Sequence, residues 1–159
     1  VADRDALAEL LAGIPAERPL RAVLHTAGVL DDGVIDAITP ERAAGVLRPK
    51  LDGARNLDEL TRELDLTAFV LFSSLAGTLG GTGQGSYAAA NAYLDALARH
   101  RRDLGLPGTS VAWGLWGGDS LASGAVAERL IRDGLPAMDP ATATVALRRA
   151  LDHDDTAVL

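Results

Sequence analysis

The chain has 159 residues, of which 48% are apolar and 23% charged, so one domain with a hydrophobic core is expected. Its net charge of −7 disfavours binding to nucleic acid or anionic lipid, and no apolar run approaches the roughly 20 residues of a membrane span. Cysteine is absent and the three histidines are scattered, so we expect a cytosolic protein without disulfides or a structural metal.

Four short runs of β-branched and aliphatic residues alternate with segments of helical pattern. The expected strands span residues 20–25, 67–73, 109–113 and 156–159. The expected helices span residues 4–12, 40–64, 86–104, 124–133 and 140–153. Thr39-Pro40 and Asp139-Pro140 predict helix starts, and Gly105 and Gly134 predict helix ends. The alternation predicts an α/β fold with a doubly wound parallel sheet.

A dinucleotide-binding loop of the pattern G-x-G-x-x-G is missing from the sequence. A doubly wound sheet carries this loop after its first strand, where it binds pyrophosphate. Val1 leads directly into a helix start, and the last residues, 157–159, form an apolar run. We therefore expect the C-terminal portion of a domain whose first βαβ units are missing.

Hydroxyl groups end the second expected strand, and a glycine-rich stretch follows them. Ser73 and Ser74 precede the stretch 77–85, after which a helix carries Tyr87 and Asn91. Ligands bind at the carboxyl ends of strands in such sheets, so Ser74 is expected beside a substrate. Residues four apart on a helix share a face, so Tyr87 and Asn91 can point into one pocket. A partly buried tyrosine with an incidental neighbour is the alternative.

Basic residues are distributed unusually, because 14 of the 15 are arginine and only Lys50 is lysine. Lys50 is the only lysine either by chance or because its site needs a compact ammonium group, which the broader guanidinium group of arginine cannot replace. The run 99–102 (Arg-His-Arg-Arg) is interpreted as a solvated helix end, where cations complement the helix dipole.

Taken together, the segments 72–77, 80–84 and 87–92 resemble the core motif of the ketoreductase domains of modular type I polyketide synthases, which are relatives of the short-chain dehydrogenases/reductases. The segments 25–28 and 111–114 are similar to the family's cofactor loop and later strand end. The resemblance covers essentially the whole chain. It implies a Rossmann-like fold, with residues 1–159 as the catalytic portion. Residues 117–134 are then approximately the substrate lid, although a surface loop and short helix is the plain alternative.

The family's spacing assigns the catalytic residues. Its serine lies thirteen residues before its tyrosine and its lysine twenty-four before that serine, which selects Ser74, Tyr87 and Lys50. Ordinary short-chain dehydrogenases have lysine four residues after the tyrosine, whereas Asn91 stands there, as in the synthase domains. The resemblance implies that Tyr87 donates the proton, Lys50 favours the ionised phenol, Ser74 binds the carbonyl oxygen and Asn91 positions Lys50 or a water.

Hydride must come from a nicotinamide cofactor, which the resemblance implies is NADPH. The implied cofactor contacts are Val1, His25, Thr26, Ala27, Gly28, Trp113 and Gly114. Trp113 and Trp116 are interpreted as packing residues that border the cofactor and the substrate entry. The implied substrate and stereocontrol residues are Leu30, Asp31, Asp32, Leu79 and Gln84.

The triplet Leu30-Asp31-Asp32 has two interpretations. Acidic residues at this place are a helix-start signal, whereas in the resembling family the triplet marks B-type domains, which form a D-configured β-hydroxyl. Leu79 stands where A-type domains carry tryptophan. Ala89 stands where B-type domains that reduce an epimerised α-substituent carry proline. The type without α-epimerisation is therefore favoured.

The implied reaction is reduction of a β-keto group on a chain held by the phosphopantetheine of an acyl carrier protein. An upstream ketoreductase segment and a structural subdomain are the other implied partners. One alternative is a free-standing short-chain dehydrogenase, which the absence of lysine at position 91 disfavours. The other is a noncatalytic structural subdomain, which the presence of Ser74, Tyr87, Asn91 and Lys50 disfavours.

Overall fold

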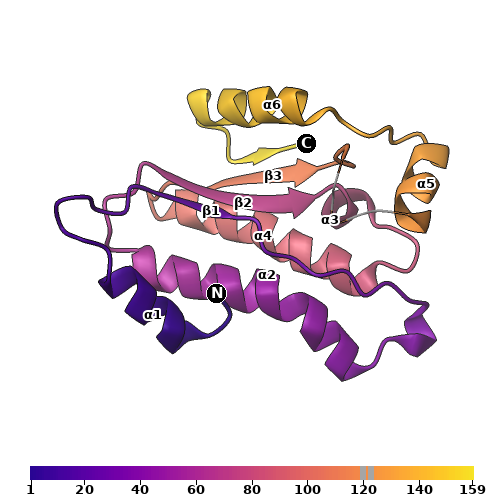
Figure 1. The fold of residues 1–159 in the computed structure, drawn as a ribbon, viewed down its shortest axis with the longest axis horizontal. Coiled ribbons are helices and arrows are strands. Elements are labelled where there is room, and N and C mark those ends of the chain that lie inside the picture. The colour runs from indigo at the N-terminus through magenta and orange to yellow at the C-terminus, as the bar shows by residue number, and fades with distance from the viewer. Residues whose placement is uncertain (119–120, 122–123) are drawn as a thin grey trace.

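Strands and helices alternate along the chain as the sequence predicts (Figure 1). The computed structural model describes residues 1–118, 121 and 124–159. Its parallel strands pair in the order β1 (Ala22–His25), β2 (Ala68–Ser74), β3 (Thr109–Trp113) and β4 (Ala157–Val158). Its helices are α1 (Arg4–Ala12), α2 (Pro40–Thr61), α3 (Ala76–Leu79), α4 (Gly85–Asp103), α5 (Ala125–Arg132) and α6 (Pro140–Asp152), with a 3-10 turn η1 (Ile35–Ala37).

Helices cover both faces of the sheet, which confirms the predicted α/β architecture. Figure 1 shows α1, α2 and α4 on one side of the strands and α6 on the other. A first core cluster joins β1 and β2 to α2 and α4 and includes the fully buried Ala54, Leu71 and Leu94. A second joins Val111 on β3 to Ala143 on α6. None of the described helices combines the length and apolarity that a membrane crossing needs.

Side-chain caps explain where several helices begin and end. Thr39 and Asp139 each accept a hydrogen bond from the backbone N–H three residues later, and Pro40 and Pro140 occupy the first turn. Gly105 and Gly134 have φ of 74° and 86°, the left-handed conformation that ends a helix. These predicted boundaries are confirmed, although β1 begins two residues later than expected and α2 ends three residues earlier.

The prediction of a solvated helix end at residues 99–102 is wrong for Arg101, which is 1% exposed. Its guanidinium pairs with Asp58 and lies 3.9 Å from the ring centroid of Phe69. The reason lies in the helical period, because Leu94, Leu97, Ala98 and Arg101 follow the i, i+3, i+4, i+7 pattern of one buried stripe. Arg101 therefore shares the core-facing side of α4, and Asp58 neutralises it there.

Candidate active site

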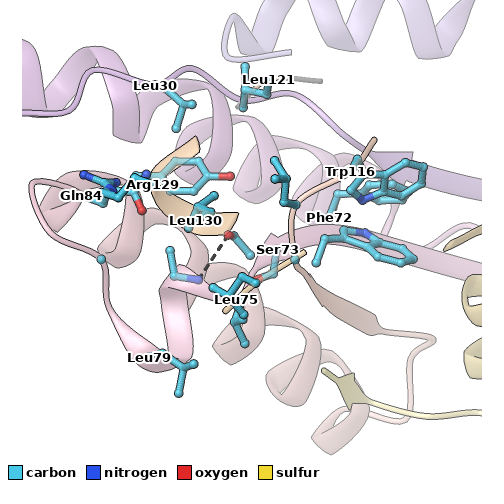
Figure 2. Close-up of a pocket in the computed structure, with 18 of the residues that line it drawn as sticks. Leu30, Phe72, Ser73, Leu75, Leu79, Gln84, Trp116, Leu121, Arg129 and Leu130 are labelled. Atoms are coloured by element: carbon cyan, nitrogen blue, oxygen red, sulfur yellow. Dashed lines mark hydrogen bonds between the residues drawn. The ribbon is translucent and has the colours of Figure 1, made fainter. Parts of the chain in front are cut away.

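A cavity of about 880 Å³ opens at the carboxyl ends of the strands. Lys50, Ser74 and Tyr87 line it together, although they come from α2, β2 and α4. Figure 2 shows Gln84 and Arg129 on one side of this cavity and Phe72 and Trp116 on the other. Three of the four predicted catalytic residues therefore meet at the edge of the sheet where ligands bind in open α/β folds.

Ser74 is the last residue of β2, and the chain turns directly from it into α3. Leu75 N–H donates to the Trp113 carbonyl at 2.9 Å, which joins this turn to the end of β3. The Ser74 hydroxyl oxygen accepts a hydrogen bond from Ala76 N–H at 3.3 Å. Accepting through the oxygen leaves the hydroxyl hydrogen available for an acceptor in the cavity.

Lys50 is 3% exposed, and its only polar contact within hydrogen-bond distance among the described residues is the Phe72 carbonyl, 2.7 Å from Nζ. The same Nζ lies 5.8 Å from the ring centroid of Tyr87. Burial lowers the pKa of Lys50 from 10.5 to about 8, and attraction to Asp95 opposes this shift. At pH 7 the group is therefore mostly an ammonium next to the tyrosine ring.

Asn91 is fully buried and is not among the residues that line the cavity. Its amide Nδ2 donates to the Tyr87 carbonyl at 2.8 Å, one turn back along α4, while Oδ1 is buried without a partner. The Ser73 hydroxyl donates to the Asn91 carbonyl at 3.2 Å and so ties β2 to this turn of the helix. The Asn91 side chain thus bonds to the backbone of Tyr87 and does not line the cavity that Tyr87 lines. Its amide group makes a local side-chain to backbone hydrogen bond within the helix instead.

The residues implied for cofactor binding divide into two groups. Thr26, Trp113 and Gly114 line the cavity, and a Cβ at Gly28 would lie 3.1 Å from Lys50 Cε, so a larger residue there would require the lysine stem to shift. The others lie outside the cavity lining. Val1 binds Asn56 Nδ2 through its carbonyl, Ala27 is half-buried, and His25 is 3% exposed.

The cavity suits the nicotinamide end of a dinucleotide, because Thr26, the Trp113 indole and Tyr87 line it together. The pyrophosphate end has no equivalent in this chain, whose sequence contains no G-x-G-x-x-G. The residues that line the cavity therefore fit the nicotinamide end of the cofactor and not its pyrophosphate.

The residues implied for substrate binding and stereocontrol lie on two loops that contact each other. Leu30, Leu79 and Gln84 line the cavity, with Leu79 nevertheless 71% exposed. Asp31 and Asp32 are not among the lining residues, and Asp31 pairs with Arg42 of α2 while Asp32 accepts from Gln84 Nε2 at 3.1 Å. Gly33 N–H also donates to the Gly83 carbonyl at 2.8 Å.

Arg129 of α5 joins these two loops, and the sequence patterns did not single it out. Its Nη1 donates to the Thr82 carbonyl at 2.9 Å, and its Nη2 lies 3.8 Å from Asp32. Together with Leu121 and Leu130 it brings the predicted lid segment onto the cavity wall. Residues 119, 120, 122 and 123 of that segment lie outside the described residues. As one arginine among 14, Arg129 carried no signal in the sequence.

A parallel α/β sheet with serine, tyrosine and lysine around the cavity at its carboxyl edge defines a Rossmann-like domain of the short-chain dehydrogenase/reductase class. The KR domain family matches residues 1–118. The chain belongs to this family, the ketoreductase domains of modular polyketide synthases.

Individual relatives agree with this assignment. The spectinabilin polyketide synthase system protein NorB of Streptomyces orinoci is 61% identical over 135 residues, which are 85% of this chain and 6% of that protein. The first ketoreductase of the tylosin PKS has 55% identity and a TM-score of 0.91, covering 98% of this chain and 34% of that one. An A-type ketoreductase has 54% identity and a TM-score of 0.95, covering 98% and 33%. The chain thus spans about a third of these solved ketoreductases.

Proposed function

We propose that this chain is the catalytic portion, residues 1–159, of a ketoreductase domain that reduces the β-keto group of an acyl chain with NADPH. The observation that carries the proposal is the meeting of Lys50, Ser74 and Tyr87 on one cavity wall at the carboxyl edge of the sheet. The same observation disfavours a noncatalytic structural subdomain, which would not need these three groups together. Asn91, in the place of the usual lysine, disfavours a free-standing short-chain dehydrogenase.

The residues of this chain handle the carbonyl oxygen and its proton. The free hydroxyl hydrogen of Ser74 binds the ketone oxygen and stabilises the negative charge that develops there. Tyr87 donates its phenolic proton to that oxygen. The Lys50 ammonium, 5.8 Å from the ring centroid, stabilises the charge left on the phenol oxygen. Asn91 holds the Tyr87 carbonyl and so fixes the turn of α4 that carries the phenol.

NADPH supplies the hydride when it is bound. Thr26, Gly28, Trp113 and Gly114 would hold its nicotinamide end, and residues outside this chain would bind the remainder. Val1, His25 and Ala27 are not among the residues that line the cavity. An upstream ketoreductase segment is thus part of the proposal, as is a structural subdomain beside it.

The product is a D-configured β-hydroxyl formed without α-epimerisation, because the chain carries Leu30-Asp31-Asp32 and has Leu79 and Ala89 at the other two marker positions. The substrate is tethered to the phosphopantetheine of an acyl carrier protein, as in synthase modules. Residues 117–134 act as the lid, which excludes water from the cavity. The cytosolic location expected from the sequence remains a prediction.

The test follows NADPH oxidation by the complete domain with a short β-ketoacyl thioester. Tyr87→Phe lowers kcat/KM by about 100-fold or more, the usual contribution of a general acid, and Ser74→Ala by a similar factor. Tyr93→Phe is the matched control, because Tyr93 lies on the same helix but packs against the first core cluster. Unchanged turnover in Tyr87→Phe would refute the assigned acid, and an L-configured alcohol would refute the B-type assignment.

A further inference from the structure

The loop that carries Leu30 has little apolar burial to hold it in place. Leu30 lines the cavity that Tyr87 also lines (Figure 2). None of residues 31–40 is buried, and Val34 and Ile35 are 71% and 81% exposed. A segment with so few buried apolar contacts depends on polar contacts for a fixed position.

Arg42, in the first turn of α2, supplies such contacts. Its Nε donates to Asp31 Oδ2 at 2.8 Å and its Nη2 donates to Asp31 Oδ1, so the guanidinium binds both carboxylate oxygens. Nη2 also donates to the Asp32 carbonyl at 3.1 Å, and Nη1 donates to the Ala37 carbonyl at 2.6 Å. One side chain thus binds the chain both before η1 and at its last residue.

The Arg42 guanidinium also lies close to the backbone of the loop. A Cβ at Gly33 would lie 3.1 Å from Arg42 Nη1 and 3.2 Å from Nη2. The backbone of Arg42 is itself fixed, because its N–H donates at 3.3 Å to the Thr39 hydroxyl oxygen that caps α2. The planar guanidinium presents several donors in a fixed arrangement, whereas the single ammonium of a lysine could reach only some of these partners.

The start of α4 holds the other side of the loop. Gln84, which precedes the first turn of α4, donates from Nε2 to Asp32 Oδ2 at 3.1 Å. The helices α2 and α4 also carry Lys50 and Tyr87. The loop is therefore tied to the same two helices that place the ammonium and the phenol, which fixes Leu30 relative to both.

The position of Leu30 matters because a ketone has two faces. The face that meets the hydride depends on the direction in which the substrate chain crosses the cavity, and a side chain in the wall restricts that direction. A loop that moved freely would let the chain bind in both directions and would weaken binding in each.

We propose that Arg42 is a positioning residue that holds the Leu30 loop against the cavity and thereby determines the configuration of the alcohol. Arg42 is not among the residues that line the cavity, so it acts through Leu30. Its effect on the product rests on the function proposed above, whereas the order of the loop does not. The two can therefore be tested separately.

The first measurement is amide hydrogen exchange of the complete domain, which needs no reaction. The N–H groups of Gly33, Ala37 and Ile38 donate to backbone carbonyls, so their exchange reports on the order of the loop. Arg42→Met is expected to speed exchange over residues 31–38 by about tenfold. Arg42→Lys is expected to do nearly the same, because it keeps the charge and loses the guanidinium.

The matched control is Arg55→Met, the same change on the same helix, at an arginine whose ion pair with Asp52 stays within α2. Its exchange over residues 31–38 should equal that of the parent. Unchanged exchange in Arg42→Met, or an equal increase in Arg55→Met, would overturn the proposal. If Arg42→Met does not fold, Asp31→Asn decides by the same readout, because it weakens the pair from the side of the loop.

The second measurement is chiral analysis with steady-state kinetics, using the complete domain, NADPH and a short β-ketoacyl thioester. Arg42→Met is expected to lower the ratio of the major to the minor alcohol by about tenfold, since charge-assisted hydrogen bonds to the loop are lost. KM should rise by about fivefold while kcat changes by less than about threefold, because Arg42 does not line the cavity. Arg42→Lys should resemble Arg42→Met, and Arg55→Met should resemble the parent.

Faster exchange with an unchanged ratio of alcohols would overturn the link between Arg42 and product configuration. A large loss of kcat with an unchanged ratio would do the same, since it would place the effect on the reacting groups. Full recovery in Arg42→Lys would overturn the need for a guanidinium. A parent domain without ketone reduction would instead refute the proposed function and leave the exchange result standing.

Discussion

At the scale of one residue, the buried His25 at the end of β1 makes the stability of the folded chain depend on pH. Burial lowers the pKa of His25 from 6.5 to about 4, and the neighbouring Lys50 charge lowers it further in the same direction. The folded chain therefore resists a proton that the unfolded chain accepts, so stability falls as pH drops from about 6.5 to about 4. The full loss is about 3 kcal/mol, the equivalent of that shift.

We expect His25→Gln to remove this part of the acid loss, because glutamine does not titrate. Urea unfolding at a series of pH values compares the variant with the parent, so that the contributions of carboxylates cancel. His100→Gln, at the exposed end of α4, is the control and should follow the parent. Parallel pH curves for the parent and His25→Gln would contradict the expectation.

The meeting of the proposed catalytic side chains in one cavity could be predicted from the sequence, whereas the hydrogen-bond partners of neighbouring residues could not. Ser74, Tyr87 and Lys50 meet because a strand end, a helix start and a neighbouring helix are fixed by the order of the sheet. The Asn91 and Arg101 side chains are oriented differently from expectation because each one binds a partner within the fold. The partner was the Tyr87 carbonyl, four residues back on α4, for Asn91, and Asp58 on α2 for Arg101.

At the scale of elements, the short helix α3 packs closely against α4. A Cβ at Gly77 would lie 3.0 Å from Ala92 N and from Asn91 Cβ, so Gly77→Ala would push α3 from the helix that carries Tyr87. Thermal unfolding is expected to show a loss of about 1 to 3 kcal/mol. Gly45→Ala is the contrasting variant, because nothing lies within 4 Å of its Cβ and a helix interior gains about 0.5 to 1 kcal/mol. Equal effects of the two changes would contradict this packing argument.

The docking of α5 depends on Arg129, which binds the Thr82 carbonyl and lies near Asp32. Under the proposed function, Arg129→Met is expected to raise KM by about fivefold and to lower the fraction of D-configured product, because a charged hydrogen bond is lost. Steady-state kinetics and chiral analysis check this. Arg132→Met, at an exposed residue of the same helix, should behave like the parent. A raised KM in both variants would point to loss of the helix rather than of this contact.

The element boundaries followed from caps and from Gly105 and Gly134, but α3 and η1 were not predicted. Both are single turns of three or four residues, which are too short to show a hydrophobic period. Gly80 ends α3 with φ of 76°, within a stretch that the sequence marks only as glycine-rich. The short helix α3 packs against α4, β2 and β3, contacts that a local pattern does not contain.

At the scale of the whole molecule, β1 is one of the two edge strands of the sheet that the structure describes, and Leu24 on it is 53% exposed. An edge strand presents unpaired backbone N–H and C=O groups, so we propose that the upstream segment pairs with this strand. Fluorescence titration is expected to show weak NADPH binding by the 159 residues and tight binding when the segment is present. Hydrogen exchange of residues 22–25 should slow in the same sample. Tight binding by the chain alone would refute the need for the segment.

The aromatic wall of the cavity gives this chain a built-in optical probe. Its two tryptophans, Trp113 and Trp116, have ring centroids 5.0 Å apart, and both line the cavity. All of the indole emission of the chain therefore originates at the site itself. Quenching or energy transfer would report directly on occupancy of the cavity, and the same signal would follow the opening of the β3 side of the core during unfolding.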